Sequence, residues 1–175
     1  MKKLLVVIDY QNDFVNGSLG FDGAEKLDGP IVQRIREYRA EGHDVAFTRD
    51  THYQDYLETQ EGKNLPVVHC IKGSHGWQIF GETAKEVREG DEVIDKPTFG
   101  SMALGEFAIE GGYDEIELVG LVSNICVMTN AAILKTALPE AIVTVNAALT
   151  ASHDPDMNGK ALDVLAGIQV NIINR

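Results

Sequence analysis

Short runs of apolar residues, rich in valine and isoleucine, recur along the chain with more polar segments between them. Continuous runs of this kind predict strands that are covered on both faces, because a strand with one face in water alternates apolar and polar residues. We expect six such strands, at residues 4–9, 44–48, 92–95, 115–120, 141–146 and 168–172.

Most segments between these runs repeat their apolar residues every three or four positions, as amphipathic helices do. Helices are expected at residues 30–40, 81–88, 103–109, 124–137 and 156–165. Strands that alternate with helices predict an α/β fold, namely a three-layer α/β/α sandwich with a central, mostly parallel six-stranded sheet. Because 175 residues can bury one substantial core, we expect a single domain over residues 1–175.

Composition and charge narrow the class of partner. The net charge of −12 argues against nucleic acid or an anionic membrane surface as a partner, because both would repel the chain. The apolar run at residues 4–8 is too short for a signal peptide, and we expect a cytoplasmic protein that acts on a small molecule. The two cysteines, Cys70 and Cys126, are expected to be reduced thiols.

Three reactive side chains stand where predicted strands end. Asp9 closes the first strand, Lys96 follows the third, and Cys126 follows the fourth, in the first turn of the next helix. Ligands of parallel sheets bind at the carboxyl ends of the strands, so we expect these side chains to meet in one cleft. The helix dipole and the Lys96 ammonium would lower the pKa of the Cys126 thiol, and Asp9 would accept its proton. Taken alone, the spacing also fits a buried cysteine, a capping aspartate and a solvated lysine.

One long segment interrupts the alternation of strands and helices. Residues 50–77 are polar, contain histidines and show little periodicity. A loop of this length inside a compact domain is usually functional.

Four phrases together resemble the isochorismatase-like cysteine hydrolase family, which includes the nicotinamidases: VVIDYQNDF (6–14), TRDTH (48–52), DKPTFGS (95–101) and GLVSNICV (120–127). They occur in the family's order and span nearly the whole chain. The resemblance implies an isochorismatase-like, Rossmann-like fold and a hydrolase that acts on C–N bonds other than peptide bonds. Its leading reaction would be the conversion of nicotinamide to nicotinate and ammonia, in a homodimer or homotetramer.

The resemblance also implies a role for each catalytic residue. Asp9 would be the general base, Lys96 would stabilise charge, and Cys126 would attack the carboxamide to form a thioester. A cis peptide at Leu121-Val122 would aim the backbone N–H groups of Val122 and Cys126 at the oxyanion.

Two phenylalanines are candidates for binding the substrate. The resemblance implies that Phe14 would pack against a flat ring, and the alternative is that it belongs to the core. Phe99 would either line the cleft or cover it.

A metal site is implied within residues 50–77. Asp50 and His52 reproduce the start of the nicotinamidase metal site, and His69 resembles its last ligand. Glu61 is the candidate for the middle ligand, with Glu58 as the alternative. Two histidines and two carboxylates suit Zn²⁺, or Fe²⁺ or Mn²⁺, and no organic cofactor is expected. The alternative is that both histidines only bond loop backbone.

Several other functions remain to be weighed. Family members that cleave the vinyl ether of isochorismate do not need a thiol, so Cys126 argues against that reaction. Amidases for carbamoyl compounds or aliphatic amides are harder to exclude, and many lack the metal loop. A nucleotide-binding or signalling module would need a glycine-rich phosphate loop after the first strand, where this chain has the acidic DYQNDF (9–14). A redox thiol protein would need a C-x-x-C pair.

Overall fold

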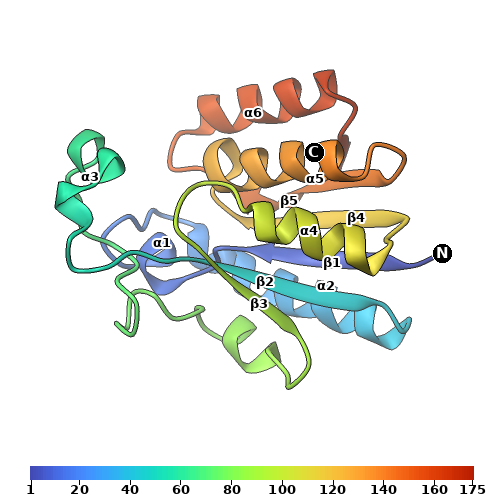
Figure 1. Ribbon diagram of the computed structural model, residues 1–175, viewed down its shortest axis with the longest axis horizontal. Helices are drawn as coiled ribbons and strands as arrows, with labels where there is room; N and C mark the ends of the chain where they lie inside the picture. Colours follow the sequence, from blue (N-terminus) through green and yellow to red (C-terminus); the bar gives the residue numbers. More distant parts are fainter.

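The computed structural model describes residues 1–175 and is built on one six-stranded sheet, in which every strand runs parallel to its neighbours (Figure 1). The strand order is β3-β2-β1-β4-β5-β6. The strands are β1 (Lys3–Ile8), β2 (Asp44–Asp50), β3 (Glu92–Lys96), β4 (Glu115–Leu121), β5 (Ile142–Ala151) and β6 (Asn171–Ile173). The predicted α/β class and the parallel six-stranded sheet are confirmed.

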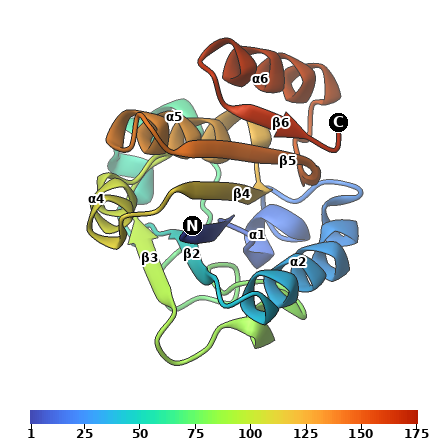
Figure 2. The same ribbon diagram turned by 90° about the vertical axis from the view of Figure 1, so that its right-hand side faces the viewer.

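Helices cover both faces of this sheet. The α-helices of the chain are α1 (Asn12–Val15), α2 (Asp28–Ala40), α3 (Gln60–Asn64), α4 (Met102–Gly111), α5 (Met128–Ala137) and α6 (Pro155–Gly167), and all of them except α3 lie against the sheet (Figure 1 and Figure 2). Figure 2 shows α4, α5 and α6 on one side of the sheet and α1 and α2 on the other, while α3 stands away from the body in Figure 1. None of these helices combines the length and the apolar composition that crossing a bilayer requires.

The central strand β1 explains why the apolar runs are continuous. Its residues alternate between two separate cores, with Leu4, Val6 and Ile8 in the core under α4, α5 and α6. Leu5 and Val7 belong to the core under α2. Because both faces of the strand are covered by helices, both sets of side chains must be apolar.

Several predicted elements differ from the structure. The strand expected at 141–146 runs from Ile142 to Ala151, and the helix expected at 124–137 begins as a π-helical turn, Ser123–Val127, before α5. The helix expected at 81–88 is only a 3₁₀ turn, Thr83–Glu86, because the backbone becomes extended at Val87 (φ −68°, ψ +123°), where the side chain packs against the core under α2. The last strand begins at Asn171 and not at residue 168, because the N–H of Ile168 still bonds to the end of α6.

A buried carboxylate ties α2 to the sheet. Glu117 on β4 is 3% exposed and accepts hydrogen bonds from Arg34 and from the Tyr38 hydroxyl. The Glu117 Oε1 atom also accepts from Asn146 Nδ2 at 3.0 Å. The charge is buried with a full set of partners, as such a group requires.

The sheet contains a switch point between β1 and β4. From β1 the chain moves to β2 and β3 on one side, whereas from β4 it moves to β5 and β6 on the other. The carboxyl ends of these two adjacent strands therefore flank the crevice in which doubly wound folds bind ligands.

Close contact between the two central strands requires glycine at position 120. Gly120 has φ +103°, and a Cβ atom there would lie 2.1 Å from the Ile8 carbonyl oxygen. We expect Gly120→Ala to lower the free energy of unfolding by about 3 kcal/mol or more, measured by urea denaturation. Gly159→Ala, within α6, where a Cβ atom would come no closer than 4.0 Å to Arg175 Nη2, is the control and should stabilise the protein by about 0.5 kcal/mol. Equal stability of Gly120→Ala and the wild type would contradict this account.

Candidate active site

Asp9 lies immediately after β1 and is fully buried. Its backbone is left-handed, with φ +43°, a conformation that is uncommon for residues other than glycine. Thr48 on β2 fixes the carboxylate by donating its hydroxyl hydrogen to Oδ1 at 2.6 Å. The strained backbone and this hydrogen bond direct Asp9 to the end of the sheet, where strain is often stored at functional sites.

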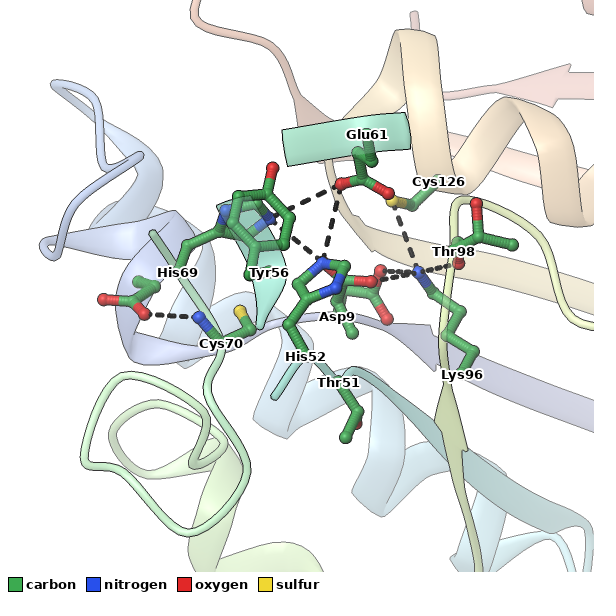
Figure 3. A network of polar contacts seen from close by, with 12 residues as sticks. Asp9, Thr51, His52, Tyr56, Glu61, His69, Cys70, Lys96, Thr98 and Cys126 are labelled. Carbon is green, nitrogen blue, oxygen red and sulfur yellow. Dashed lines mark hydrogen bonds and ion pairs between the residues drawn. The ribbon is translucent and has the colours of Figure 1, made fainter. Parts of the chain in front are cut away.

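Lys96, the last residue of β3, brings the predicted residues together (Figure 3). Its Nζ atom lies 2.6 Å from Asp9 Oδ2 and 3.5 Å from Cys126 Sγ. It also donates to the Thr98 carbonyl at 2.9 Å and lies 3.3 Å from Asp50 Oδ1. Although burial lowers the pKa of Lys96, the charges of Asp9, Cys126 and Asp50 raise it above its usual value, so the side chain is an ammonium.

Cys126 lies in a π-helical turn, Ser123–Val127, that connects β4 to α5. The preceding peptide between Leu121 and Val122 is cis, as the resemblance implied. The Cys126 side chain is 4% exposed. Single π-helical turns of this kind occur frequently at functional sites.

Asn130, one turn beyond Cys126, joins the cysteine to the loop that follows Lys96. Its Nδ2 donates to the carbonyl of Cys126 at 2.8 Å and to that of Phe99 at 3.1 Å. Its Oδ1 accepts from the Ser101 N–H at 3.0 Å. The amide therefore keeps the Lys96 loop and the cysteine at a fixed separation.

Burial decides the charge of the thiol. The pKa of Cys126 is raised well above its usual value, first by burial and then by the Asp9 carboxylate, while Lys96 opposes the rise. The predicted lowering of this pKa is therefore wrong in its net direction, although the effect of Lys96 has the expected sign. Burial also raises the pKa of Asp9 against the Lys96 charge, which makes its carboxylate a stronger base.

The four predicted metal ligands form a second cluster beside the first. Ligand atoms of Asp50, His52, Glu61 and His69 all lie within 4.8 Å of one another. His52 Nε2 is 3.0 Å from Asp50 Oδ2 and 3.5 Å from Glu61 Oε1, and His69 Nε2 is 3.3 Å from the same Asp50 oxygen. Two imidazoles and two carboxylates converging on one point form a set of donors that fits a divalent transition metal.

The environment of the histidines also suits metal binding. His69 Nδ1 lies 2.7 Å from the Val67 carbonyl, so Nδ1 carries a hydrogen and Nε2 faces the cluster. The ring of Tyr56 packs against both histidines, with centroid distances of 4.6 Å to His52 and 5.0 Å to His69. Burial, with the charges of Glu61 and Asp50, raises the pKa of Tyr56 to about 12, so its hydroxyl stays neutral.

The remaining candidates are the alternative metal ligand Glu58 and the two phenylalanines proposed to bind the substrate. Glu58 is exposed and outside the cluster, which favours Glu61 as the middle ligand. Phe14 is buried, with its ring centroid 5.7 Å from that of His69, whereas the Phe99 side chain is 44% exposed. The supporting residues Thr48, Tyr56 and Asn130 were not predicted, and only Thr48 stood inside one of the four phrases.

Comparisons with known proteins show the family and the fold. The isochorismatase domain model matches residues 3–174. The chain is similar to a nicotinamidase of Saccharomyces cerevisiae, with 24% identity and coverage of 99% of this chain and 100% of the yeast protein. It is also similar to the solved pyrazinamidase/nicotinamidase of Streptococcus mutans, with 26% identity, a TM-score of 0.87 and coverage of 98% and 100% of the two chains. The pyrazinamidase of Pyrococcus horikoshii, solved in complex with zinc, has the same fold, with a TM-score of 0.87 at 19% identity over 100% of both chains.

Removing the Asp9 charge should lower the pKa of the Cys126 thiol, because the Lys96 ammonium then acts on the sulfur without that opposing carboxylate. We expect the ultraviolet absorbance of the Cys126 thiolate to develop at lower pH in Asp9→Asn than in the wild type, with Cys70 replaced by alanine in both proteins. Asp44→Asn, at the opposite end of the sheet, is the control. A thiolate that forms at the same or a higher pH in Asp9→Asn would show that the carboxylate does not hold the thiol neutral.

Proposed function

This chain belongs to the isochorismatase family, and we propose that within it the protein is a cysteine hydrolase that converts nicotinamide to nicotinate and ammonia. The observation that carries the proposal is the Lys96 ammonium, which contacts both the Asp9 carboxylate and the Cys126 sulfur. Nucleophile, base and cation are thus adjacent, at the carboxyl ends of the strands. The similarity to nicotinamidases supports the choice of substrate.

The first half of the reaction forms a thioester. The Cys126 sulfur attacks the carboxamide carbon while its proton passes to Asp9, and the C=O electron pair moves to oxygen. The tetrahedral intermediate then collapses, and the C–N bond breaks as the proton held by Asp9 is transferred to nitrogen. Ammonia leaves, and the acyl group remains on sulfur.

The second half restores the enzyme. Asp9 takes a proton from water as the water oxygen attacks the thioester carbon, and the C–S bond breaks. The product leaves as nicotinic acid and loses its remaining proton to solvent to give nicotinate, and the other water proton returns from Asp9 to the Cys126 sulfur. Lys96 stays protonated throughout, and its charge compensates the negative charge on either the Asp9 carboxylate or the Cys126 sulfur. This role agrees with the raised pKa of Lys96.

Backbone N–H groups at residues 122 and 126 would stabilise the oxyanion. Val122 is buried, and its N–H makes no hydrogen bond within the chain, so it is free to bind a developing negative oxygen. Cys126 would supply the second N–H from the π-helical turn. One such donor is typically worth about 3 kcal/mol in the transition state.

The second cluster would hold one divalent metal ion, Zn²⁺ or alternatively Fe²⁺ or Mn²⁺, through Asp50, His52, Glu61 and His69. Such an ion supplies a Lewis acid that can take the pyridine nitrogen of nicotinamide as a ligand. Phe14, whose ring lies beside His69, would pack against the pyridine ring. Phe99 would cover the site from the exposed side.

We also propose where the protein works and how it assembles. Both cysteines are unpaired, which fits a single-domain cytoplasmic enzyme in a reducing compartment. The exposed apolar residues Met102 and Ile109 on α4 support a homo-oligomer, a dimer or a tetramer.

The nucleophile can be tested against the other buried cysteine. Cys126→Ala should lower kcat/KM for ammonia release from nicotinamide by roughly 10³-fold or more, because no other side chain in the site can form the thioester. Cys70→Ala, the matched control, should retain activity. Comparable activity in Cys126→Ala and the wild type would refute the thioester route.

The metal site can be tested by removal and return of the ion. Purified protein should contain about one divalent ion per chain, and His52→Ala should contain much less, because it lacks one of the four donors. Chelation should abolish nicotinamide hydrolysis, and added Zn²⁺ or Mn²⁺ should restore it. Full activity of metal-free protein on carbamoyl compounds or aliphatic amides would instead favour another amidase of the family.

A further inference from the structure

Three consecutive side chains just after Asp9 reach into the segment that carries the metal ligands. The first, Gln11, is fully buried and binds both backbone groups of Asp50. Its Oε1 accepts from the Asp50 N–H at 2.7 Å, and its Nε2 donates to the Asp50 carbonyl at 2.9 Å. The same Nε2 donates to the Trp77 carbonyl at 2.8 Å. Gln11 therefore joins the two ends of the 50–77 segment.

Asp13 holds the middle of this segment. Its Oδ2 accepts from the Cys70 N–H at 2.7 Å. Cys70 directly follows His69, and both residues are labelled in Figure 3. The Cys70 carbonyl in turn accepts from the His52 N–H at 2.9 Å. One carboxylate thus fixes the backbone beside both histidines.

Asn12 completes the contact on the far side. Its Nδ2 donates to the His75 carbonyl at 2.7 Å, and its backbone N–H donates to the Gln78 carbonyl at 2.9 Å. Gly76 packs so closely on Asp13 that a Cβ atom there would lie 2.1 Å from Oδ2. The segment is therefore pressed directly against residues 11–13.

We propose that Gln11 and Asp13 are positioning residues for the divalent ion, and that they hold Asp50, His52 and His69 in the arrangement that binds it. The inference rests on the proposed function, because it takes the cluster to be a metal site. The ligands come from a strand end and a loop, so their spacing depends on contacts outside the cluster. Partners of this kind typically contribute 10- to 100-fold to metal affinity.

The test compares metal affinity with overall stability. Dissociation constants for Zn²⁺ are measured by competition with a chromophoric chelator for the wild type, Gln11→Ala and Asp13→Ala, and both variants should bind 10- to 100-fold more weakly. Asp13→Asn keeps one acceptor oxygen and should recover part of the loss. Asn146→Ala, which removes a buried amide from the Glu117 network, is the matched control and should lower the melting temperature without weakening Zn²⁺ binding.

Amide hydrogen exchange separates this inference from the metal site itself. In metal-free protein, Gln11→Ala should speed exchange in peptides covering residues 50–77 and leave β4 unchanged, whereas Asn146→Ala should not affect residues 50–77. Absence of Zn²⁺ binding in the wild type would refute the proposed metal site, and the exchange result would then show only that Gln11 orders residues 50–77. Wild-type Zn²⁺ affinity in both alanine variants, or unchanged exchange at residues 50–77, would overturn the inference.

Discussion

The ion pair between Lys96 and Asp9 is the constraint on which the rest of the site depends. Both side chains have no exposed surface, and an unpaired charge in such a place costs several kcal/mol. The two residues come from β3 and β1, which are separated in the sheet by β2. Their contact at 2.6 Å therefore requires both side chains to reach over the carboxyl end of β2, between Thr48, which bonds to Asp9, and Asp50, the last residue of the strand. The geometry of the sheet and the electrostatics of the pair fix each other.

This pair also explains why burial does not prevent the proposed chemistry. A thiolate beside the Asp9 carboxylate would place two negative charges next to one ammonium, and the raised pKa of Cys126 reflects that cost. Transfer of the thiol proton to Asp9 leaves one negative charge, now on sulfur or substrate, paired with the same ammonium. The total charge of the buried group stays constant through the attack, so little new desolvation accompanies it.

The sequence predicted the sheet well, because strands that are covered on both faces appear as continuous apolar runs. Such runs can be recognised without any knowledge of tertiary contacts. It also placed Asp9, Lys96 and Cys126 at strand ends, which the parallel sheet brings together. The net pKa shift of Cys126 was mistaken because the sequence shows which charges are near but not how deeply the thiol is buried. The helix expected at 81–88 failed for a related reason, since Val87, where the turn ends, packs against the core under α2, whose residues are distant in sequence.

Asp50 connects the two clusters and sets their separation. Its Oδ1 faces Lys96, while its Oδ2 faces both His52 and His69. Asp50 pairs with Lys96 in the register of β2 and β3, so the sheet itself determines where the carboxylate stands. Under the proposed function, a substrate held at the metal cluster by its ring would present its carboxamide at a distance from Cys126 that this one residue fixes. A shift of Asp50 would therefore disturb both the binding of the substrate ring and the attack of Cys126 on the carboxamide. The hydrogen bonds from the buried Gln11 side chain to the N–H and the carbonyl of Asp50 oppose such a shift.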